Sequence, residues 1–264
     1  MPIFLTAAVA FALASPAGAA LYTDGPRIPD SAAIAISYRV WQNESGGSSE
    51  GLTHWNRGEG FASMGIGHFI WYPAGRRGPF DESFPRLLSY LEGRGVVLPA
   101  WLRDSPPCPW PDRRAFRRDL QSPRMVELRN LLTSTLALQA RFMADRLESA
   151  LPRMLASAPR ARREALQRRF AALAAQEQGL YALIDYVNFK GEGVSPAERY
   201  NGRGWGLLQV LAQMRGDAGG TDALADFSRA ACRVLYRRVR NSPPQRGESR
   251  WLSNWRHRVG TYLG

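Results

Sequence analysis

Between residues 45 and 73 the sequence changes its pattern, and this change limits the folds open to the chain. Residues 31–44, SAAIAISYRVWQNE, place apolar side chains at helical spacing, and Asp30 or Ser31 is suited to cap that helix. Residues 45–73 lose this spacing, are rich in glycine, and alternate around FASMGIGHFIWY as strands do. Helical spacing then returns and continues to the C-terminus. The sequence therefore predicts an α+β domain, mainly α, with a small β hairpin or meander after its first helix.

The rest of the chain is expected to form helices joined by proline- and glycine-rich breaks. Residues 131–155 have the strongest amphipathic pattern and predict a long central helix with Pro152 near its end. Residues 160–176 predict a basic helix whose arginines form either a solvated face, as expected, or a binding stripe. The predicted breaks are residues 104–112, 157–162, 191–198 and 241–248. No internal repeat is found in the sequence, so residues 20–264 are expected to form one domain.

The N-terminus predicts export. Residues 3–14, IFLTAAVAFALA, form an apolar run of signal-peptide length, and residues 17–19 fit the small-x-small cleavage rule. Residues 1–19 are therefore expected to be a signal peptide, although they lack the usual basic start. A short membrane anchor and a buried N-terminal helix are the alternatives. Since no later stretch approaches the length of a membrane span, the mature protein is expected to be periplasmic or secreted, without stable membrane insertion, and a monomer.

The charge of the chain indicates an anionic partner. The formal net charge is +12, and because Lys190 is the only lysine, this charge comes almost wholly from arginine. Such a field favours nucleic acid, anionic lipid or an acidic cell-wall polymer. Export makes nucleic acid an unsuitable partner, so we expect the partner to be a cell-wall polymer.

The cysteines and histidines give little support to a metal site. Cys108 and Cys232 are too few and too far apart for zinc, and the chain has three histidines. In an oxidising compartment the two cysteines either form a disulfide or remain one buried and one loop thiol, and the sequence leaves both open. No metal and no cofactor are expected.

The residues suited to chemistry gather at the end of the first predicted helix and just after it. Glu44 ends the helix, and burial of its carboxyl in a cleft would disfavour ionisation and suit it to act as a general acid. A second carboxylate on the glycine-rich segment would stay ionised and hold or activate water. Glu59 is the candidate for this carboxylate, and the hydroxyl of Ser63 can orient the water. An acid, an opposing carboxylate and a hydroxyl are the groups that glycosidic-bond cleavage requires.

The order of these residues resembles the phage-type lysozymes, glycoside hydrolase family 24 of the lysozyme-like superfamily. The matching features are a helix ending in Glu44 and the motif SMGIGH, in which Ser63 precedes His68 by five residues. Residues 181–194 and 249–263 are also similar to helices of that family. The resemblance implies a lysozyme-like fold in which Glu44 donates the proton, and in which a Thr of the family is replaced by Ser63.

The chain departs from that family at the second carboxylate. The family's hairpin Asp falls on Arg57, which cannot act as a base, so Glu59 is the nearest substitute and Glu50 the second. Residues 74–175 are a helical elaboration that the resemblance does not cover. Arg57 favours a different class of function, namely an inactive lysozyme-like protein whose arginine-rich surface binds the cell wall.

A second resemblance lies within the same superfamily. Glu44-Ser45 matches the Glu-Ser pair of lytic transglycosylases and goose-type lysozymes, and Tyr200-Asn201 is similar to the Tyr-Asn pair beside their catalytic Glu. A transglycosylase uses a hydroxyl of the substrate as nucleophile and needs only one acid/base group. This resemblance implies that Glu59 is dispensable.

Further side chains are expected to bind substrate. His68 is expected to support the cleft floor rather than act as a base. The aromatic residues Phe69, Trp71 and Tyr72 either pack in the core or offer a stacking surface for sugars. Asp185 interrupts an apolar helix, where it either ties the helix to the hairpin or points into the cleft. The predicted substrate-binding residues are His68, Trp71, Tyr72, Asn188, Tyr200, Asn201, Trp205 and Gln209.

Together these features and the resemblance predict an exported muramidase whose partner is the glycan strands of peptidoglycan, in which it hydrolyses the β-1,4 bond between N-acetylmuramic acid and N-acetylglucosamine. Its predicted catalytic residues are Glu44, Glu59 and Ser63. The alternatives are a lytic transglycosylase that uses Glu44 alone and an inactive cell-wall-binding protein.

Overall fold

The computed structural model describes residues 28–263 except 46, 79, 105 and 217–221, and it does not describe the side chains of residues 37–40 and 42–45. The predicted signal peptide, residues 1–19, lies outside the described residues. The first helix, α1 (Asp30–Ser45), agrees with the predicted bounds to within one residue at each end. Among the helices described, none has both the length and the apolar character needed to cross a membrane.

A three-stranded antiparallel sheet follows α1 and confirms the predicted meander. Its strands are β1 (Thr53–His54), β2 (Ala62–Met64) and β3 (Phe69–Trp71), with β2 in the centre. The register places Ser63 opposite His54 on one side and Ile70 on the other.

Helices make up most of the chain after this sheet. They are α2 (Phe84–Gly93), α3 (Arg113–Arg118), α4 (Pro123–Ser134), α5 (Leu136–Ser157), α6 (Arg160–Ala174), α7 (Glu177–Lys190), α8 (Leu207–Gln213), α9 (Ala223–Asn241) and α10 (Leu252–Gly260). A second hairpin, β4 (Arg199–Tyr200) with β5 (Arg203–Gly204), lies between α7 and α8. When 3-10 helices are included, the predicted breaks at residues 157–162, 191–198 and 241–248 each contain a helix end, and the break at residues 104–112 lies between η2 (Ala100–Leu102) and α3. The chain is mainly helical with few strands, as the predicted α+β, mainly α class requires.

The central helix differs from the prediction at its start. One helix was expected over residues 131–155, whereas α4 and α5 are separate and Thr135 lies between them. The hydroxyl of Thr135 donates to the carbonyl of Leu131 (2.7 Å), and Nε2 of Gln139 donates to another carbonyl near the end of α4 (2.7 Å). Side chains thus occupy carbonyls that a continuous helix would bond through its backbone. Pro152 lies inside α5, which continues to Ser157.

The same glutamine docks the turn between β2 and β3. The backbone N–H of Ile66 donates to Oε1 of Gln139 (3.1 Å), and Gln139 is fully buried. Gly65 has a φ of +68°, and a Cβ at this position would collide with Oε1 of Gln139. The first glycine of GIGH is therefore required both by its backbone conformation and by the close approach of α5.

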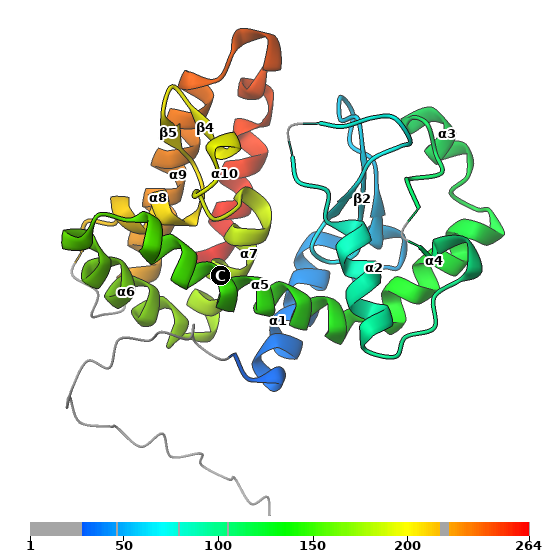
Figure 1. Ribbon diagram of the computed structural model, residues 1–264, viewed down its shortest axis with the longest axis horizontal. Coiled ribbons are helices and arrows are strands. Elements are labelled where there is room, and N and C mark those ends of the chain that lie inside the picture. Colours follow the sequence, from blue (N-terminus) through cyan, green and yellow to red (C-terminus); the bar gives the residue numbers. More distant parts are fainter. Residues whose placement is uncertain (1–27, 46, 79, 105, 217–221, 264) are drawn as a thin grey trace, which may run out of the picture.

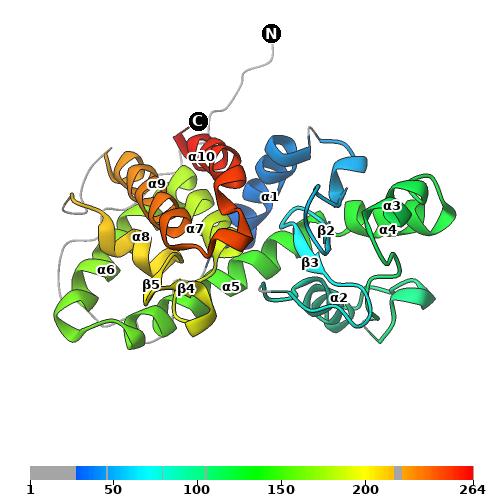
Figure 2. The ribbon, with the colours of Figure 1, turned by 90° about the horizontal axis from the view of Figure 1, so that it is seen from above.

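The elements form two lobes joined by α1 and α5 (Figure 1). One lobe contains the sheet with α2, α3 and α4, and the other contains α6 to α10 with the β4–β5 hairpin. Seen from above, α5 runs between the two lobes (Figure 2). Buried apolar side chains from both lobes belong to one core cluster. The sheet therefore faces the C-terminal helices across the centre of the molecule.

The two cysteines lie in different lobes and are free. Cys108 is buried beside the sheet, and Cys232 is half-buried in α9. The disulfide that the sequence left open is not formed. Burial raises the pKa of both thiols, that of Cys108 to about 12, so both are protonated at neutral pH.

Candidate active site

Glu44 lies in the last turn of α1, next to the final residue of the helix, as predicted. Its side chain lies outside the described part of the structure, so its separation from Glu59 stays a prediction. Only residues 46–49 separate α1 from the 3-10 helix η1 (Glu50–Leu52), which directly precedes β1. Of the other predicted catalytic residues, Glu59 lies in the loop between β1 and β2, and Ser63 lies in β2.

Glu59 lines a pocket between the lobes. Its carboxyl is half-buried and accepts a hydrogen bond from Nδ2 of Asn56 (3.1 Å), and its backbone carbonyl accepts one from the indole of Trp55 (2.8 Å). Burial raises the pKa of Glu59, while Asn56 and the charge of Lys190 oppose the shift. Arg57, at the position of the family's Asp, and Glu50, the second candidate for the carboxylate, are both exposed, unlike Glu59. Glu59 is thus the partly desolvated carboxylate of this segment.

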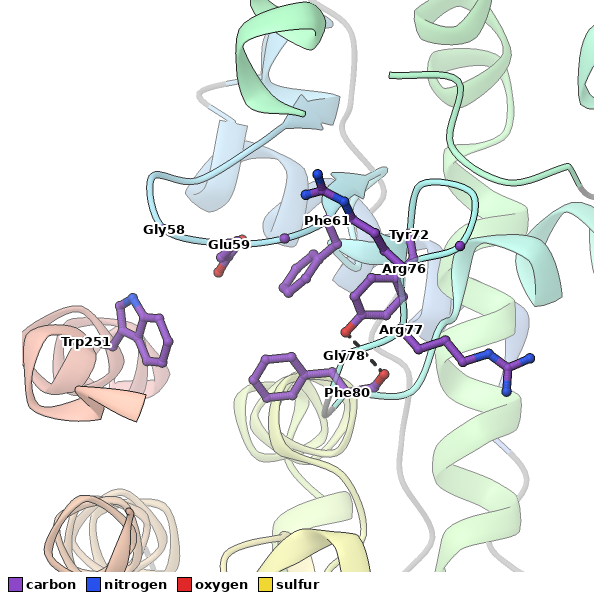
Figure 3. A pocket seen from close by; sticks show the side chains of 11 residues that line it. Gly58, Glu59, Phe61, Tyr72, Arg76, Arg77, Gly78, Phe80 and Trp251 are labelled. Atoms are coloured by element: carbon purple, nitrogen blue, oxygen red, sulfur yellow. Dashed lines mark hydrogen bonds between the residues drawn. The ribbon is translucent and has the colours of Figure 1, made fainter. Parts of the chain in front are cut away.

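The pocket itself has a volume of about 450 Å³. Most of its lining comes from residues 58–61 and 72–80 of the sheet lobe, and Trp251 comes from the opposite lobe, on the 3-10 helix η5 (Glu248–Trp251). Figure 3 shows Glu59 at one side of the pocket, between Trp251 and the aromatic side chains of the sheet lobe. Ser63 and His68 are not among the lining residues. The structure therefore brings Glu59 and Tyr72 to one pocket but leaves Ser63 outside it.

Ser63 and His68 lie where the sheet faces the other lobe. Ser63 is buried, and side chains opposite one another across strands share a face of the sheet, which places Ser63 beside His54. The rings of His54 and His68 stack with centroids 5.5 Å apart. Burial, with the nearby charge of Arg258, lowers the pKa of His68 to about 3, and burial also lowers the pKa of His54. Both rings are therefore neutral near pH 7, which suits the structural role expected of His68.

The two aromatic residues at the end of β3 have different surroundings. Trp71 is fully buried, packs against Phe84 with ring centroids 4.7 Å apart, and donates its indole N–H to the carbonyl of Pro106 (2.8 Å). The prediction that Trp71 binds substrate was wrong, because residues from the unmatched segment cover the ring. Tyr72 lines the pocket and directs its hydroxyl to the carbonyl of Phe80 (3.4 Å).

Helix α7 contains the polar residues Asp185 and Asn188. Asp185 is fully buried and accepts two hydrogen bonds from Arg258 (2.6 and 3.0 Å) and one from Tyr262 (2.5 Å). It therefore ties α7 to the C-terminal helix rather than to the hairpin. Asn188 donates to the carbonyl of Ile184 (2.8 Å), and its shielded Oδ1 has no hydrogen-bond partner among the described residues. Asn188 remains a candidate for substrate binding.

The β4–β5 hairpin is held by a buried ion pair. Arg238 bonds to Glu248 through two contacts of 2.8 Å, and Tyr200 donates its hydroxyl to the same carboxylate (2.8 Å). Burial alone would raise the pKa of Glu248, but the hydrogen bonds and charge of Arg238 lower it. The guanidinium of Arg238 lies 4.1 Å from the ring centre of Trp205, which is 5% exposed. Trp205 therefore packs in this network instead of offering a binding surface, contrary to the prediction.

Asn201 and Gln209 shape the backbone around the hairpin. Asn201 and Gly202 form its turn with φ values of +49° and +70°, the conformation for which an Asn-Gly pair is favoured, and Asn201 is exposed. Gln209 donates to the carbonyl of Gly193 (2.9 Å) and accepts from the N–H of Gly206 (2.9 Å). These contacts give both residues structural roles, and substrate binding by them stays a prediction.

Lys190 is a feature of this region that the sequence reasoning missed. The only lysine of the chain is 8% exposed at the end of α7, with Nζ 3.5 Å from the ring centre of Trp255 and 3.8 Å from that of Phe189. No hydrogen-bond acceptor for Nζ is found among the described residues. Burial lowers its pKa well below the usual value, and the charges around it come from Arg238, Glu248, Arg258 and Glu59. The fact that Lys190 is the only lysine in an arginine-rich chain is the sequence signal that could have drawn attention to it.

Replacing Lys190 with Met is expected to stabilise the protein by on the order of 1–3 kcal/mol at pH 7, because Met fills the same space without burying an amine. The folded pKa lies below the unfolded one, so the unfolded wild type binds more protons and its stability rises toward about pH 10.5. The advantage of Lys190→Met over wild type should therefore shrink as pH rises. Urea unfolding from pH 7 to 10 measures this, with Lys190→Arg as a destabilised control. A variant less stable than wild type at pH 7 would contradict the account.

Within the described ranges, no three His, Cys, Asp or Glu side chains come together in a way that could hold a metal ion.

Comparisons with known proteins found no family model that matches the chain, and no curated protein or solved structure matches it either. The function is therefore argued from the geometry of the site.

Proposed function

We propose that the protein is an exported peptidoglycan-cleaving glycosidase of lysozyme-like fold, a muramidase acting on the β-1,4 bond between N-acetylmuramic acid and N-acetylglucosamine. The observation that carries the proposal is the placement of Glu59. It is half-buried in a pocket between the lobes, on the segment that directly follows the Glu44-bearing helix. A pair of carboxyls on opposite sides of the scissile bond is the usual arrangement for hydrolytic glycoside cleavage.

In this mechanism Glu44 protonates the oxygen of the glycosidic bond while Glu59 takes a proton from the attacking water. The bond from the anomeric carbon to that oxygen breaks, and the water oxygen forms the new bond to the anomeric carbon. A raised pKa supports the role of Glu59, because a carboxylate becomes a stronger base as its pKa approaches the working pH. Ser63 is not placed in the Glu59 pocket, so the proposal does not depend on it.

The structure favours hydrolysis over the single-acid alternative at one point. Tyr200, which resembles the tyrosine of lytic transglycosylases, uses its hydroxyl to bond Glu248 and to accept from Arg246 (2.7 Å). Asn201, its partner in that motif, lies on an exposed turn. The pair is thus engaged in holding the second hairpin, which weakens the basis for the transglycosylase alternative.

Digestion of purified peptidoglycan sacculi tests the proposal. The exported protein should release soluble sugar fragments, and the turbidity of the suspension should fall with time. Uncharged chitin particles provide the control for non-specific glycan cleavage. Binding to sacculi with no released fragments would reject the enzyme and support the wall-binding alternative.

A further inference from the structure

The pocket that contains Glu59 has aromatic walls on both sides. On the sheet side Phe61 packs edge-on against Tyr72 and Phe80, with ring centroids 5.4 and 5.8 Å apart, and all three rings line the pocket. On the other side stands Trp251 (Figure 3). A volume of about 450 Å³ with apolar walls and a few polar groups is typical of a small-ligand site.

Trp251 has the features of a ligand-binding ring. It is half-buried, its ring centroid lies 6.1 Å from that of Trp255, and the guanidinium of Arg250 lies over its ring at 4.4 Å from the centroid. Its indole N–H has no acceptor among the residues that the structure describes. A partly buried indole usually donates a hydrogen bond, so this ring can both stack on a ligand and donate to it.

The charged groups around the pocket are mainly cationic. Arg76 and Arg77 lie on the loop that follows β3, Arg250 approaches Gly58 from the opposite lobe, and Glu59 is the acidic residue of the lining. Figure 3 shows Arg76 extending toward Phe61, whereas Arg77 points away from the pocket centre. Neither guanidinium has an ion-pair partner within the described chain. Arg76 can therefore bind an anionic group of a ligand held between the aromatic walls.

We propose that this pocket is a subsite for an amino sugar that bears a carboxylate. The C–H face of the pyranose ring stacks on Trp251, Glu59 accepts from a ring hydroxyl or amide, and Arg76 binds the carboxylate. The inference rests on the proposed function for the glycan nature of the ligand. In peptidoglycan such a carboxylate comes either from the lactyl group of a muramic acid without peptide or from the peptide attached to it.

Binding measurements by calorimetry test the subsite with three probes. These are the disaccharide of N-acetylglucosamine and N-acetylmuramic acid with a free lactyl group, the same disaccharide with a dipeptide attached, and di-N-acetylchitobiose, which has no charge. We expect at least one carboxylated disaccharide to bind about tenfold or more tightly than chitobiose, and the tighter of the two identifies the source of the carboxylate.

Variants of the two loop arginines provide a matched pair. Arg76→Gln should remove the preference for the charged disaccharide, and Arg77→Gln should keep it. Because both residues are exposed, neither change should impair folding. Trp251→Leu should weaken all probes about tenfold or more, and a thermal melt identifies a loss that comes from misfolding. Equal affinity for charged and uncharged disaccharides, or equal effects of the two arginine variants, would overturn the subsite.

The binding test of the subsite and the cleavage test of the proposed function can fail independently. Arg76-dependent binding in a protein that releases no fragments from sacculi would keep the subsite and reject the glycosidase. Cleavage of sacculi by a protein without preference among the disaccharides would keep the glycosidase and reject the subsite.

Discussion

Replacement of Glu44 by Gln is expected to slow peptidoglycan cleavage by about 10²–10⁴-fold, the usual contribution of a general acid. The amide keeps the size and most hydrogen bonds of the side chain but has no proton to transfer to the leaving oxygen. Release of soluble fragments from sacculi, measured at equal protein concentration, gives the rate. The thermal melt of the variant should match that of wild type.

Replacement of the second carboxylate, Glu59, distinguishes hydrolysis by two carboxyls from a reaction that uses Glu44 alone. Glu59→Gln should be nearly as inactive as Glu44→Gln if Glu59 is the base. Glu50→Gln is the matched control, because Glu50 is exposed on the same segment and should not affect the rate. Normal activity of Glu44→Gln would remove the proposed acid, and normal activity of Glu59→Gln would leave Glu44 acting alone.

Replacement of Asp185 by Asn is expected to destabilise the fold by about 3–5 kcal/mol, the cost typical of breaking a buried ion pair from one side. Asp185 is fully buried and bonds both Arg258 and Tyr262, so the change leaves the Arg258 charge without its carboxylate. The contact joins α7 to the C-terminal helix, which supports the Trp251 side of the pocket. Denaturant unfolding measures the loss.

An exposed ion pair provides the control for that prediction. Glu164 and Arg168 form an i,i+4 pair on α6 with side chains 84% and 55% exposed. Glu164→Gln should change the free energy of unfolding by less than about 0.5 kcal/mol, since water solvates both groups already. Equal losses for Asp185→Asn and Glu164→Gln would show that the buried triad does not hold the lobe together.

The sequence predicted those parts of the fold that depend on local pattern. The helix up to Ser45, the meander and the helix boundaries follow from apolar spacing and from glycine and proline placement. The break at Thr135 was missed because it depends on Gln139 bonding both the end of α4 and the turn at Gly65. That contact joins residues far apart in sequence and leaves no local signal.

The site was predicted less completely, for a similar reason. Glu59 was found from its position near the expected carboxylate, but the burial of Trp71 depends on Phe84 and Pro106, which lie in a segment without recognised pattern. The pocket role of Trp251 and the burial of Lys190 arise only when the two lobes come together. Contacts between residues of different lobes depend on the tertiary structure, so neither periodicity nor composition predicts them.

The most direct test of the central claim is mass spectrometry of sugar ends after digestion of sacculi in water labelled with heavy oxygen. Two-carboxylate hydrolysis predicts new reducing ends on muramic acid, each with one heavy oxygen from the attacking water. Anhydro-muramyl ends without label would contradict it and assign the reaction to Glu44 alone, and the absence of any new end would contradict glycan cleavage altogether.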